Sequence, residues 1–260
     1  MATAKDIIIK PIKAAAANAI IKKIHYSGKA VNNSRLHFGV FLGGKLEGAM
    51  QFGCSIDIRK TKGLVTGTGW NDFIELNRMA FSDALPKFSE SRALGVAIRA
   101  IRKNYKQIKW IISFSDATQC GDGAIYRASG FVLTGIKKNT QMLRMPDGSI
   151  QAKKSLDNPN NSHGGQFGSK IALNNGAVRL DGFQLRYVYF IDKSYIGKLT
   201  VPILPFSDID KMGAGMYKGK TVTLQERRVT KATPSDQLGS GGAIPTNALQ
   251  PIQEADSNGR

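Results

Sequence analysis

A nearly continuous apolar run, Trp110–Ser115, is the sequence feature that most constrains the fold. Such a run is typical of a strand that is covered on both faces, as in the middle of an α/β sheet. The elements expected around it follow the order helix, hairpin, strand, helix, strand, helix, strand. The sequence therefore predicts the α/β class, with a mixed β-sheet flanked by helices.

Local patterns predict the elements of this sheet. Helices are expected over 14–24, 92–104 and 123–129, the last ending at Gly130. Leu94, Ile98 and Ile101 would form the apolar stripe of the second helix. Strands are expected over 7–9, 36–42, 46–52, 72–81, 110–115, 131–136, 141–144 and 183–191.

Composition divides the chain into three parts. Residues 1–205 are expected to form one catalytic domain, in which the polar stretch 146–180, rich in Asn, Gly and Ser, predicts a long loop or insertion. The sheet is expected to have a C-terminal strand extension, and residues 206–231 are interpreted as a basic C-terminal extension. Residues 232–260 predict a disordered tail, because Gly, Ser, Pro, Asn and Gln dominate there.

The charge predicts a polyanionic partner. The chain has 37 Lys+Arg and 19 Asp+Glu, for a net charge of +18, and the residues before 232 carry +20. Nucleic acid is the commonest partner for such an excess, although charge alone does not separate DNA from RNA. The candidate phosphate contacts are Arg59, Lys60 and Lys62 in one basic loop and Lys137 and Lys138 in another. A solvated basic face is the alternative for either loop.

Two cysteines, Cys54 and Cys120, exclude a four-cysteine zinc site and a disulfide framework, which favours a reducing compartment. No run approaches the ~20 apolar residues of a membrane helix, and residues 1–6 lack the apolar core of a signal peptide. These features predict a soluble cytoplasmic protein with no membrane partner. The oligomeric state is left open, with a homodimer as one option.

One short motif points to a cofactor. Arg92-Ala-Leu-Gly95-Val-Ala97 has the form R-x-x-G-x-A, and it follows a strand and opens a helix. Small residues at a helix start let backbone N–H groups approach a pyrophosphate, which the helix dipole also favours. An ordinary amphipathic helix is the alternative. The motif resembles the acetyl-CoA loop of the GNAT acetyltransferase superfamily, and Ala124–Phe131 resembles the superfamily's late helix, whose tyrosine often protonates the leaving thiolate.

Further motifs narrow the resemblance. They are His25-Tyr26-Ser27, Glu75-Leu-Asn-Arg78, Glu90-Ser91-Arg92, Ser115-Asp116, Ala124-Ile-Tyr126-Arg-Ala and Arg186-Tyr-Val-Tyr-Phe190. In this order, over about 25–191, they resemble the bacteriophage Mom DNA-modification proteins. The resemblance implies a GNAT-like enzyme that converts adenine in double-stranded DNA to N6-carbamoylmethyl adenine and so protects phage DNA from restriction in the host cytoplasm. It also implies a sheet splayed near Arg78 and Trp110.

The resemblance also assigns roles to residues. Arg78 and Ser91 would hold acetyl-CoA, with Arg92, Gly95 and Ala97 as the pyrophosphate loop. Tyr26 and Asp116 would be catalytic, with His25 and Tyr126 close by. Asp116 follows a buried strand, where its carboxylate could accept a proton from adenine's weakly nucleophilic amino group. The plain alternatives are a turn cap for Asp116, a core aromatic for Tyr26 and a structural histidine for His25.

The resemblance raises iron as a second cofactor, but the sequence predicts no metal site, since it has no H-x-x-x-H or Cys/His pair. The product would also need a nitrogen source, because transfer from acetyl-CoA alone gives an N-acetyl group. Two other functions stay open: a GNAT N-acetyltransferase acting on a small amine or protein, and a non-catalytic basic DNA-binding protein. The basic charge favours DNA over a small molecule, and the Arg92 motif favours an enzyme.

Overall fold

A computed structural model describes residues 2–158, 167–217 and 220–222, which belong to one unit, Met1–Leu224. The predicted tail at 232–260 and the end of the 206–231 extension lie outside the described residues. The described part of the extension forms α7 (Asp208–Lys211), β11 (Met216–Tyr217) and β12 (Lys220–Thr221). Within the described residues, no helix combines the length and the apolar character needed to cross a bilayer.

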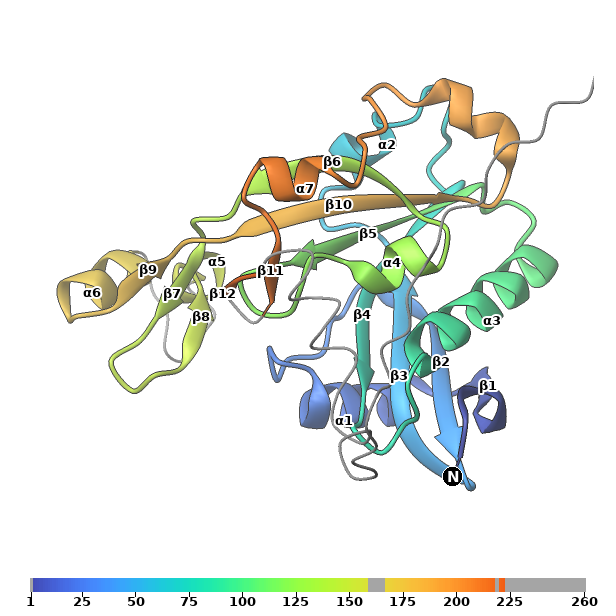
Figure 1. Cartoon of the computed structure of the whole chain (residues 1–260), viewed down its shortest axis with the longest axis horizontal. Coiled ribbons are helices and arrows are strands. Elements are labelled where there is room, and N and C mark those ends of the chain that lie inside the picture. The colour runs from blue at the N-terminus through green and yellow to red at the C-terminus, as the bar shows by residue number, and fades with distance from the viewer. Residues whose placement is uncertain (1, 159–166, 218–219, 223–260) are drawn as a thin grey trace, which may run out of the picture. The chain divides into compact units, whose positions relative to one another are not determined.

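A seven-stranded sheet forms the centre of this unit (Figure 1). Its order is β1 (Ile8–Pro11), β2 (Ser34–Leu42), β3 (Lys45–Gly53), β4 (Phe73–Phe81), β5 (Trp110–Asp116), β10 (Phe183–Phe190) and β6 (Val132–Lys138). Neighbouring strands are antiparallel except β4 and β5, which are parallel. The predicted mixed α/β sheet is confirmed, with the apolar run of β5 in its interior.

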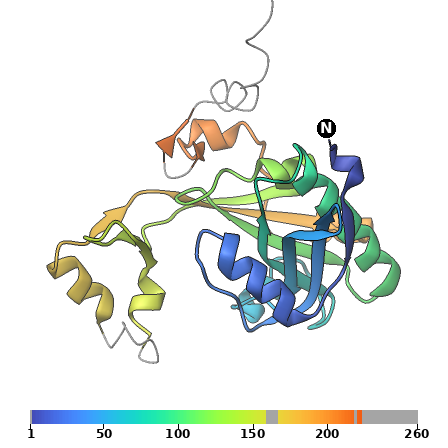
Figure 2. The same cartoon turned by 90° about the horizontal axis from the view of Figure 1, so that it is seen from below.

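Helices cover both faces of the sheet (Figures 1 and 2). On one face, α1 (Ala14–Ile24) buries Ala17 and Ile21 against the sheet residues Ala49 and Ala80. On the other, α3 (Ser89–Asn104) buries the predicted stripe of Leu94, Ile98 and Ile101 in the main core, beside α4 (Ala124–Ala128). Shorter helices of the unit include η1 (Ala4–Asp6), α2 (Ile58–Lys62) and η2 (Lys193–Lys198).

The parallel pair β4 and β5 is joined over a short length only. Phe73, Ile74 and Glu75 pair with Trp110, Ile111 and Ile112, and the two strands then separate. The register with β3 shifts at Asn77, which marks a β-bulge, so β4 bends where the pairing ends. The predicted splay is therefore confirmed near Arg78, whereas at Trp110 the prediction was wrong, because there the strands are paired.

Beyond the paired residues of β4 and β5, a side-chain hydrogen bond takes the place of backbone hydrogen bonds between the two strands. The Ser113 hydroxyl of β5 donates to the carbonyl of Leu76 in β4 at 3.4 Å. This bond spans the gap with a side chain instead of a backbone N–H, so it keeps the strands near each other without closing them. The opening between β4 and β5 is thus bounded by polar groups from both strands.

Residues 146–180 were predicted as a loop or insertion, and the structure shows a folded insertion rather than an open loop. A three-stranded sheet forms from β7 (Met142–Arg144), β8 (Ile150–Ala152) and β9 (Val178–Leu180), with α5 (Lys153–Leu156) and α6 (Gly168–Asn174) beside it. Leu143, Leu156, Ala172 and Ala177 give it a small core of its own. We call the described residues of 141–181 the accessory lobe.

The strand at 141–144 has other neighbours than expected, because it belongs to the accessory lobe. The strands at 131–136 and 141–144 were expected to follow each other across Lys137–Asn139, but β6 continues to Lys138 and pairs with β10, while β7 belongs to the lobe. The reason is the turn Pro146-Asp147-Gly148, in which Gly148 has φ +82° and the chain folds back from β7 to β8.

We predict that Trp110 holds the joined end of β4 and β5 together. Its ring is fully buried and stacks on Phe73 at 4.5 Å, and its Nε1 donates to Thr68 Oγ1 at 3.1 Å. Trp110→Ala should lower the free energy of unfolding by about 3–5 kcal/mol, because it leaves a cavity. Urea denaturation measures this change.

The matched control is Trp70→Ala. Trp70 is 54% exposed, and its ring carries only the Lys62 ammonium at 5.4 Å. Its loss should cost about 1 kcal/mol or less. Equal effects of the two substitutions would show that Trp110 has no special part in closing the strand pair.

Candidate active site at the splayed strands

The chain turns sharply where α1 ends, and this turn places His25 and Tyr26 at the site. The His25 N–H still bonds to the Ile21 carbonyl, and Gly28 then takes a left-handed conformation with φ +59°. The rings of His25 and Tyr26 lie 4.1 Å apart, tilted by 33°. The two residues therefore form one aromatic pair at the C-terminal end of α1.

The hydrogen bonds of His25 define its tautomer. The backbone N–H of Ser27 donates to Nδ1 at 3.1 Å, so Nδ1 is an acceptor, and the Ser27 hydroxyl lies 2.8 Å from the same atom. The proton of the neutral ring must then sit on Nε2. Burial, helped by the charge of Arg78, lowers the pKa of His25 to about 4. At neutral pH His25 is thus an uncharged N–H donor at Nε2.

Tyr26 lies within electrostatic range of four other polar side chains. Burial raises the pKa of its phenol, Cys120, Asp116 and Tyr126 add to that effect, and Arg78 opposes it. Its side chain is nevertheless 48% exposed to solvent, so one part of the ring is accessible to a substrate. Tyr26 keeps its proton at neutral pH and can act as a donor, but not as a base.

Asp116 ends β5 and caps the turn that follows. Its Oδ1 accepts the Thr118 N–H at 3.0 Å and the Asn139 side-chain amide at 3.3 Å. The predicted alternative of a turn cap is thus present in the structure. Both of these bonds go to Oδ1, and no hydrogen bond to Oδ2 is present in the described part of the chain.

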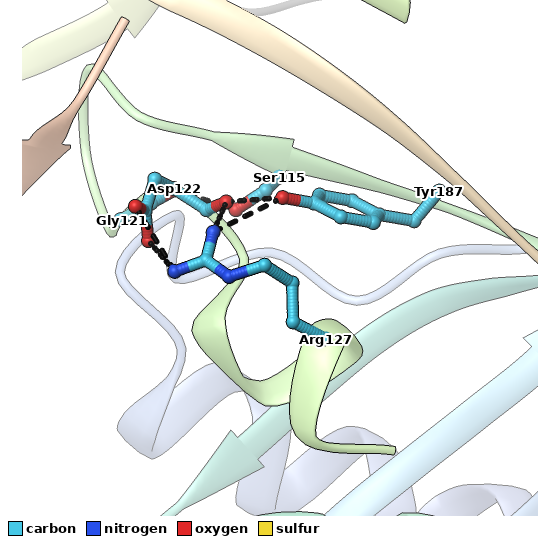
Figure 3. A network of polar contacts seen from close by, with 5 residues as sticks. All are labelled: Ser115, Gly121, Asp122, Arg127 and Tyr187. Atoms are coloured by element: carbon cyan, nitrogen blue, oxygen red, sulfur yellow. Dashed lines mark hydrogen bonds and ion pairs between the residues drawn. The ribbon is translucent and has the colours of Figure 1, made fainter. Parts of the chain in front are cut away.

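A buried polar network fixes the rest of this turn (Figure 3). The Asp122 carboxylate accepts two bonds from Arg127 Nη2 at 3.2 Å, and Tyr187 and Arg127 both donate to the Asp122 carbonyl. Ser115 donates to the Gly121 carbonyl, which closes the loop onto β5. Since Asp122 is buried, its pairing with Arg127 holds the segment between β5 and α4 in one conformation.

Gly123 lets α4 approach this network. It has φ +81°, and a Cβ at this position would lie 2.4 Å from the Tyr187 ring. Only glycine fits there, and α4 can then bury Tyr126 against Phe131 and Tyr187. Burial raises the pKa of Tyr126, while a hydrogen bond with Ser113 opposes that shift. Tyr126 is therefore a protonated phenol beside the splay.

Glu75 and Cys120, to which the sequence assigned no role, also lie near Tyr26 and Tyr126 at the splay. Burial raises the pKa of Glu75, although Ser55, Asn77 and Arg78 oppose that shift. The Cys120 thiol donates to the Asp116 carbonyl at 2.9 Å, and burial raises its pKa, which keeps it a thiol. Arg78 bonds the Asn77 carbonyl through Nη1, and its Nε is buried without a partner in the described residues.

A hollow of about 390 Å³ lies at the start of α3. Three of the residues predicted for the cofactor line it, Ser91, Arg92 and Gly95, together with Lys5, Phe88, Arg99 and others. Two of the predicted residues are elsewhere. Ala97 is fully buried on the side of α3 that faces the core. Arg78 lies near His25 and Tyr26. The hollow is rich in cations, with Lys5, Arg92 and Arg99 at its lining.

The start of α3 corrects one prediction. The helix was expected to begin near Arg92 but begins at Ser89, because Phe88 adopts φ +70° and Glu90 places an acid in the first turn. Arg92 N already bonds to the Phe88 carbonyl. Among the described residues, the first-turn amides without a backbone partner are therefore those of Glu90 and Ser91, one turn before Gly95.

The predicted basic residues lie on two separate segments. The first was expected to be a loop but is α2, where the Asp57 side chain caps the amide of Lys60. Arg59 and Lys60 are exposed there, while Lys62 lies over the Trp70 ring. Lys137 and Lys138 are exposed at the end of β6, opposite Gln184 and Phe183 of β10 and close to where the accessory lobe starts.

Sequence reasoning missed several residues of the site. Arg99 follows Gly95 by four residues and Arg92 by seven, so helical spacing places all three on one face. Lys5 comes from η1 and carries no sequence signal for its place in the hollow. The pair of Asp122 and Arg127 has a five-residue spacing that no motif marks, and it forms only because the turn before α4 brings the two together.

The described residues do not fit a metal ion. Among them, no three His, Cys, Asp or Glu side chains gather as a set of ligands. His25 has its Nδ1 occupied by Ser27, and Cys120 stays a neutral thiol, whereas metal ligation needs a free nitrogen or a thiolate. The iron raised by the resemblance therefore has no ligand set here, and no step is derived through it.

A mixed sheet flanked by helices, with parallel strands that separate beside a titratable cluster, makes this a mixed α/β protein. The model of the Mom protein family matches residues 6–208. The chain is 35% identical over 191 residues to methylcarbamoylase mom of Escherichia phage Mu, which covers 73% of this chain and 77% of that protein. The chain belongs to the Mom protein family.

Solved structures with a similar arrangement are acetyltransferases. The ribosomal-protein-S18-alanine N-acetyltransferase of Escherichia coli is 13% identical, with a TM-score of 0.40 over 72% of this chain and 94% of that one. A GNAT family acetyltransferase of Elizabethkingia anophelis, solved with acetyl-CoA bound, is 12% identical, with a TM-score of 0.37 over 71% and 98%. These similarities are too low to transfer an activity.

We predict that His25 makes stability depend on pH. Between about pH 6.5 and about pH 4 the unfolded chain binds a proton at this position that the folded chain does not. The contribution of the neutral ring to the free energy of unfolding is therefore fully present above about pH 6.5. It is lost as the pH falls from about 6.5 to about 4. The free energy of unfolding of His25→Gln should fall less over the same range, as measured by urea denaturation at each pH.

The control for this experiment is His37→Gln. Burial also lowers the pKa of His37, but less strongly, so its curve should stay closer to that of the unsubstituted protein. If the His25→Gln curve runs parallel to the curve of the unsubstituted protein from pH 6.5 to 4, His25 titrates normally and is not a neutral donor.

Proposed function

We propose that this protein is a DNA-modifying enzyme that converts adenine in double-stranded DNA to N6-carbamoylmethyl adenine and thereby protects phage DNA from restriction. One observation carries the proposal: Tyr26, Arg78, Asp116 and Tyr126 gather at the splay of β4 and β5 in a chain of the Mom protein family. Its relative in phage Mu has the name methylcarbamoylase, which contains the same methyl and carbamoyl units as the group proposed here.

The residues around the splay suit a reaction at an amino group. Adenine's N6 is a weak nucleophile because its lone pair is delocalised into the ring, so removal of a proton assists it. Asp116 Oδ2 would accept that proton, since both internal bonds of the carboxylate use Oδ1. His25 as a neutral imidazole and Tyr26 and Tyr126 as protonated phenols would donate hydrogen bonds to the substrate.

Acetyl-CoA would bind with its phosphates at the hollow at the start of α3. When bound, it would supply the two-carbon unit of the product, while the amide nitrogen must come from a second donor. Lys5, Arg92 and Arg99 would bind its phosphates, and the unpaired amides of Glu90 and Ser91 would add two donors at the positive end of α3. Arg78 would act at the splay, beside Tyr26, rather than at the phosphates.

The charge of the chain supports DNA as the substrate. A net charge of +18 suits a long polyanion much better than a small amine or an acidic patch on a protein. An adenine in duplex DNA must also leave the base stack before its amino group can reach a side chain such as Asp116. The half-exposed ring of Tyr26 offers a surface on which such a base can stack.

We predict that Asp116→Asn abolishes adenine modification. Asparagine keeps the Oδ1 acceptor for Thr118 and Asn139, so the turn should persist, but it removes the basic oxygen. Mass spectrometry of nucleosides from plasmid DNA of expressing cells should detect carbamoylmethyl adenine with the unsubstituted protein only. It also distinguishes this product from the N-acetyl adenine of an ordinary acetyltransferase.

Asp83→Asn is the matched control, because Asp83 is exposed and lies between β4 and α3. It should leave modification unchanged. Modification at the original rate by Asp116→Asn would reduce Asp116 to a turn cap, and absence of any modified adenine with the unsubstituted protein would reject the proposed function itself.

We predict that Gly95→Val weakens acetyl-CoA binding at least about tenfold, or ~1.4 kcal/mol. A Cβ at Gly95 would meet only the Arg99 guanidinium, at 3.5 Å, so the helix should tolerate the side chain while the hollow is filled. Calorimetry with acetyl-CoA measures the change. Gly197→Val is the control, since a Cβ at Gly197 meets nothing within 4 Å and lies outside this hollow. Equal affinity of the two variants would place the cofactor elsewhere.

A further inference from the structure

The accessory lobe is attached to the turn that carries Asp116. At the point where it starts, Asn139 donates through its side chain to Asp116 Oδ1 and through its backbone to the Gly182 carbonyl. Where it ends, the Phe183 carbonyl accepts the N–H of Ala117. Gly182 packs so closely on Thr118 that a Cβ there would lie 1.9 Å from its hydroxyl. The residues that flank the lobe on both sides therefore contact the turn that carries Asp116.

The lobe also contacts the second segment of the candidate active site. The Lys29 ammonium, three residues after Tyr26, donates to the Ser155 hydroxyl of α5 at 3.4 Å. Figures 1 and 2 show the lobe beside the loop that follows α1, while α3 lies on the opposite face of the sheet. The lobe thus adjoins both segments that carry candidate catalytic side chains, and it lies away from the hollow at the start of α3.

The lobe and the strand end leading into it carry a strong positive charge. Residues 137–181 contain seven basic residues, Lys137, Lys138, Arg144, Lys153, Lys154, Lys170 and Arg179, against three acidic residues, Asp147, Asp157 and Asp181. In the described residues, no side-chain ion pair involves any of these seven cations. Five of these seven cations lie on the accessory lobe, which has a small core of its own.

The lysines of α5 line an open hollow of about 580 Å³. Its other lining residues are Gln141, Asp157 and Asn158, so ammonium and amide groups face the opening together. The Asp157 carboxylate is held by the N–H and the hydroxyl of Ser169, and the charge of Lys153 helps to lower its pKa. Lys154 is exposed, so its charge is directed to solvent.

We propose that the accessory lobe is a clamp for the phosphate backbone of DNA, in which Lys153 and Lys154, with Lys29 across from them, hold the strand whose adenine enters the splay. The proposal rests on the proposed function for its choice of DNA. The phosphates of acetyl-CoA have a separate cationic hollow on the other face. A second copy of the chain is disfavoured, because two surfaces of the same strong charge repel each other.

The clamp would explain why the lobe is attached beside Asp116. An enzyme that acts on a base within a duplex must unstack it, and phosphate contacts near the target offset that cost. Here those contacts would be made by a unit bonded to Asp116 and to the loop after Tyr26. Binding of the backbone and placement of the proton acceptor would then occur as one event.

The test uses the full chain and the double variant Lys153→Gln, Lys154→Gln. Its affinity for a fluorescent adenine-containing duplex is measured by anisotropy at several salt concentrations. Each lost phosphate contact removes about 0.9 from the slope of log K against log salt, so the slope should fall by about 1.8. Acetyl-CoA affinity, measured by calorimetry, should not change.

The control is Lys103→Gln, Lys106→Gln, which removes two exposed charges at the end of α3. Its slope should stay within a few tenths of the original. An unchanged slope for the α5 variant, an equal fall in both variants, loss of acetyl-CoA affinity in place of DNA affinity, or no duplex binding by the unsubstituted protein would each overturn the clamp. If duplex binding depends on the two lysines of α5 but no modified adenine is detected, the clamp is retained and the proposed function is rejected.

Discussion

The short pairing of β4 with β5 is the constraint on which the rest of the site depends. Three residues of each strand are joined, and the strands then part at the bulge around Asn77. Had the ladder continued, backbone bonds would have occupied the space into which Arg78 and Ser113 now bring polar groups. The stacked pair of Trp110 and Phe73 holds the joined end closed, so the strands can open at one end without separating.

Burial gives the polar groups at this opening their chemical character. It favours the uncharged form of each group, so His25 is a neutral N–H donor, and Tyr26, Tyr126 and Cys120 keep their protons. Asp116 differs because it is an acceptor within the structure: its Oδ1 accepts hydrogen bonds from Thr118 and Asn139. The opening thus has a hydrogen-bond acceptor in Asp116 and several neutral donors near it.

The sequence predicts the elements that depend on local patterns. The apolar run of β5, the stripe at Leu94, Ile98 and Ile101, and the left-handed Gly130 after α4 are all recognisable without a structure. The accessory lobe was expected only as a polar loop or insertion, because its core comes from four residues at irregular spacing, Leu143, Leu156, Ala172 and Ala177. Its turn Pro146-Asp147-Gly148 was the available signal. The partner of Asp122 and the tautomer of His25 are set by tertiary contacts, which no local pattern contains.

The two basic hollows lie with different helices, and this separation bears on the order of binding. The hollow lined by Lys5, Arg92 and Arg99 belongs to the face covered by α3, whereas Lys153 and Lys154 belong to the lobe beside the end of α1. Phosphates bound at one hollow therefore do not compete for space with phosphates bound at the other. Asp116 accepts a hydrogen bond from Asn139, two residues before the accessory lobe, whereas none of its hydrogen bonds, among the described residues, goes to a residue that lines the hollow at the start of α3. On the proposed function, DNA bound at the lobe would therefore affect the position of Asp116 more directly than a cofactor bound in that hollow.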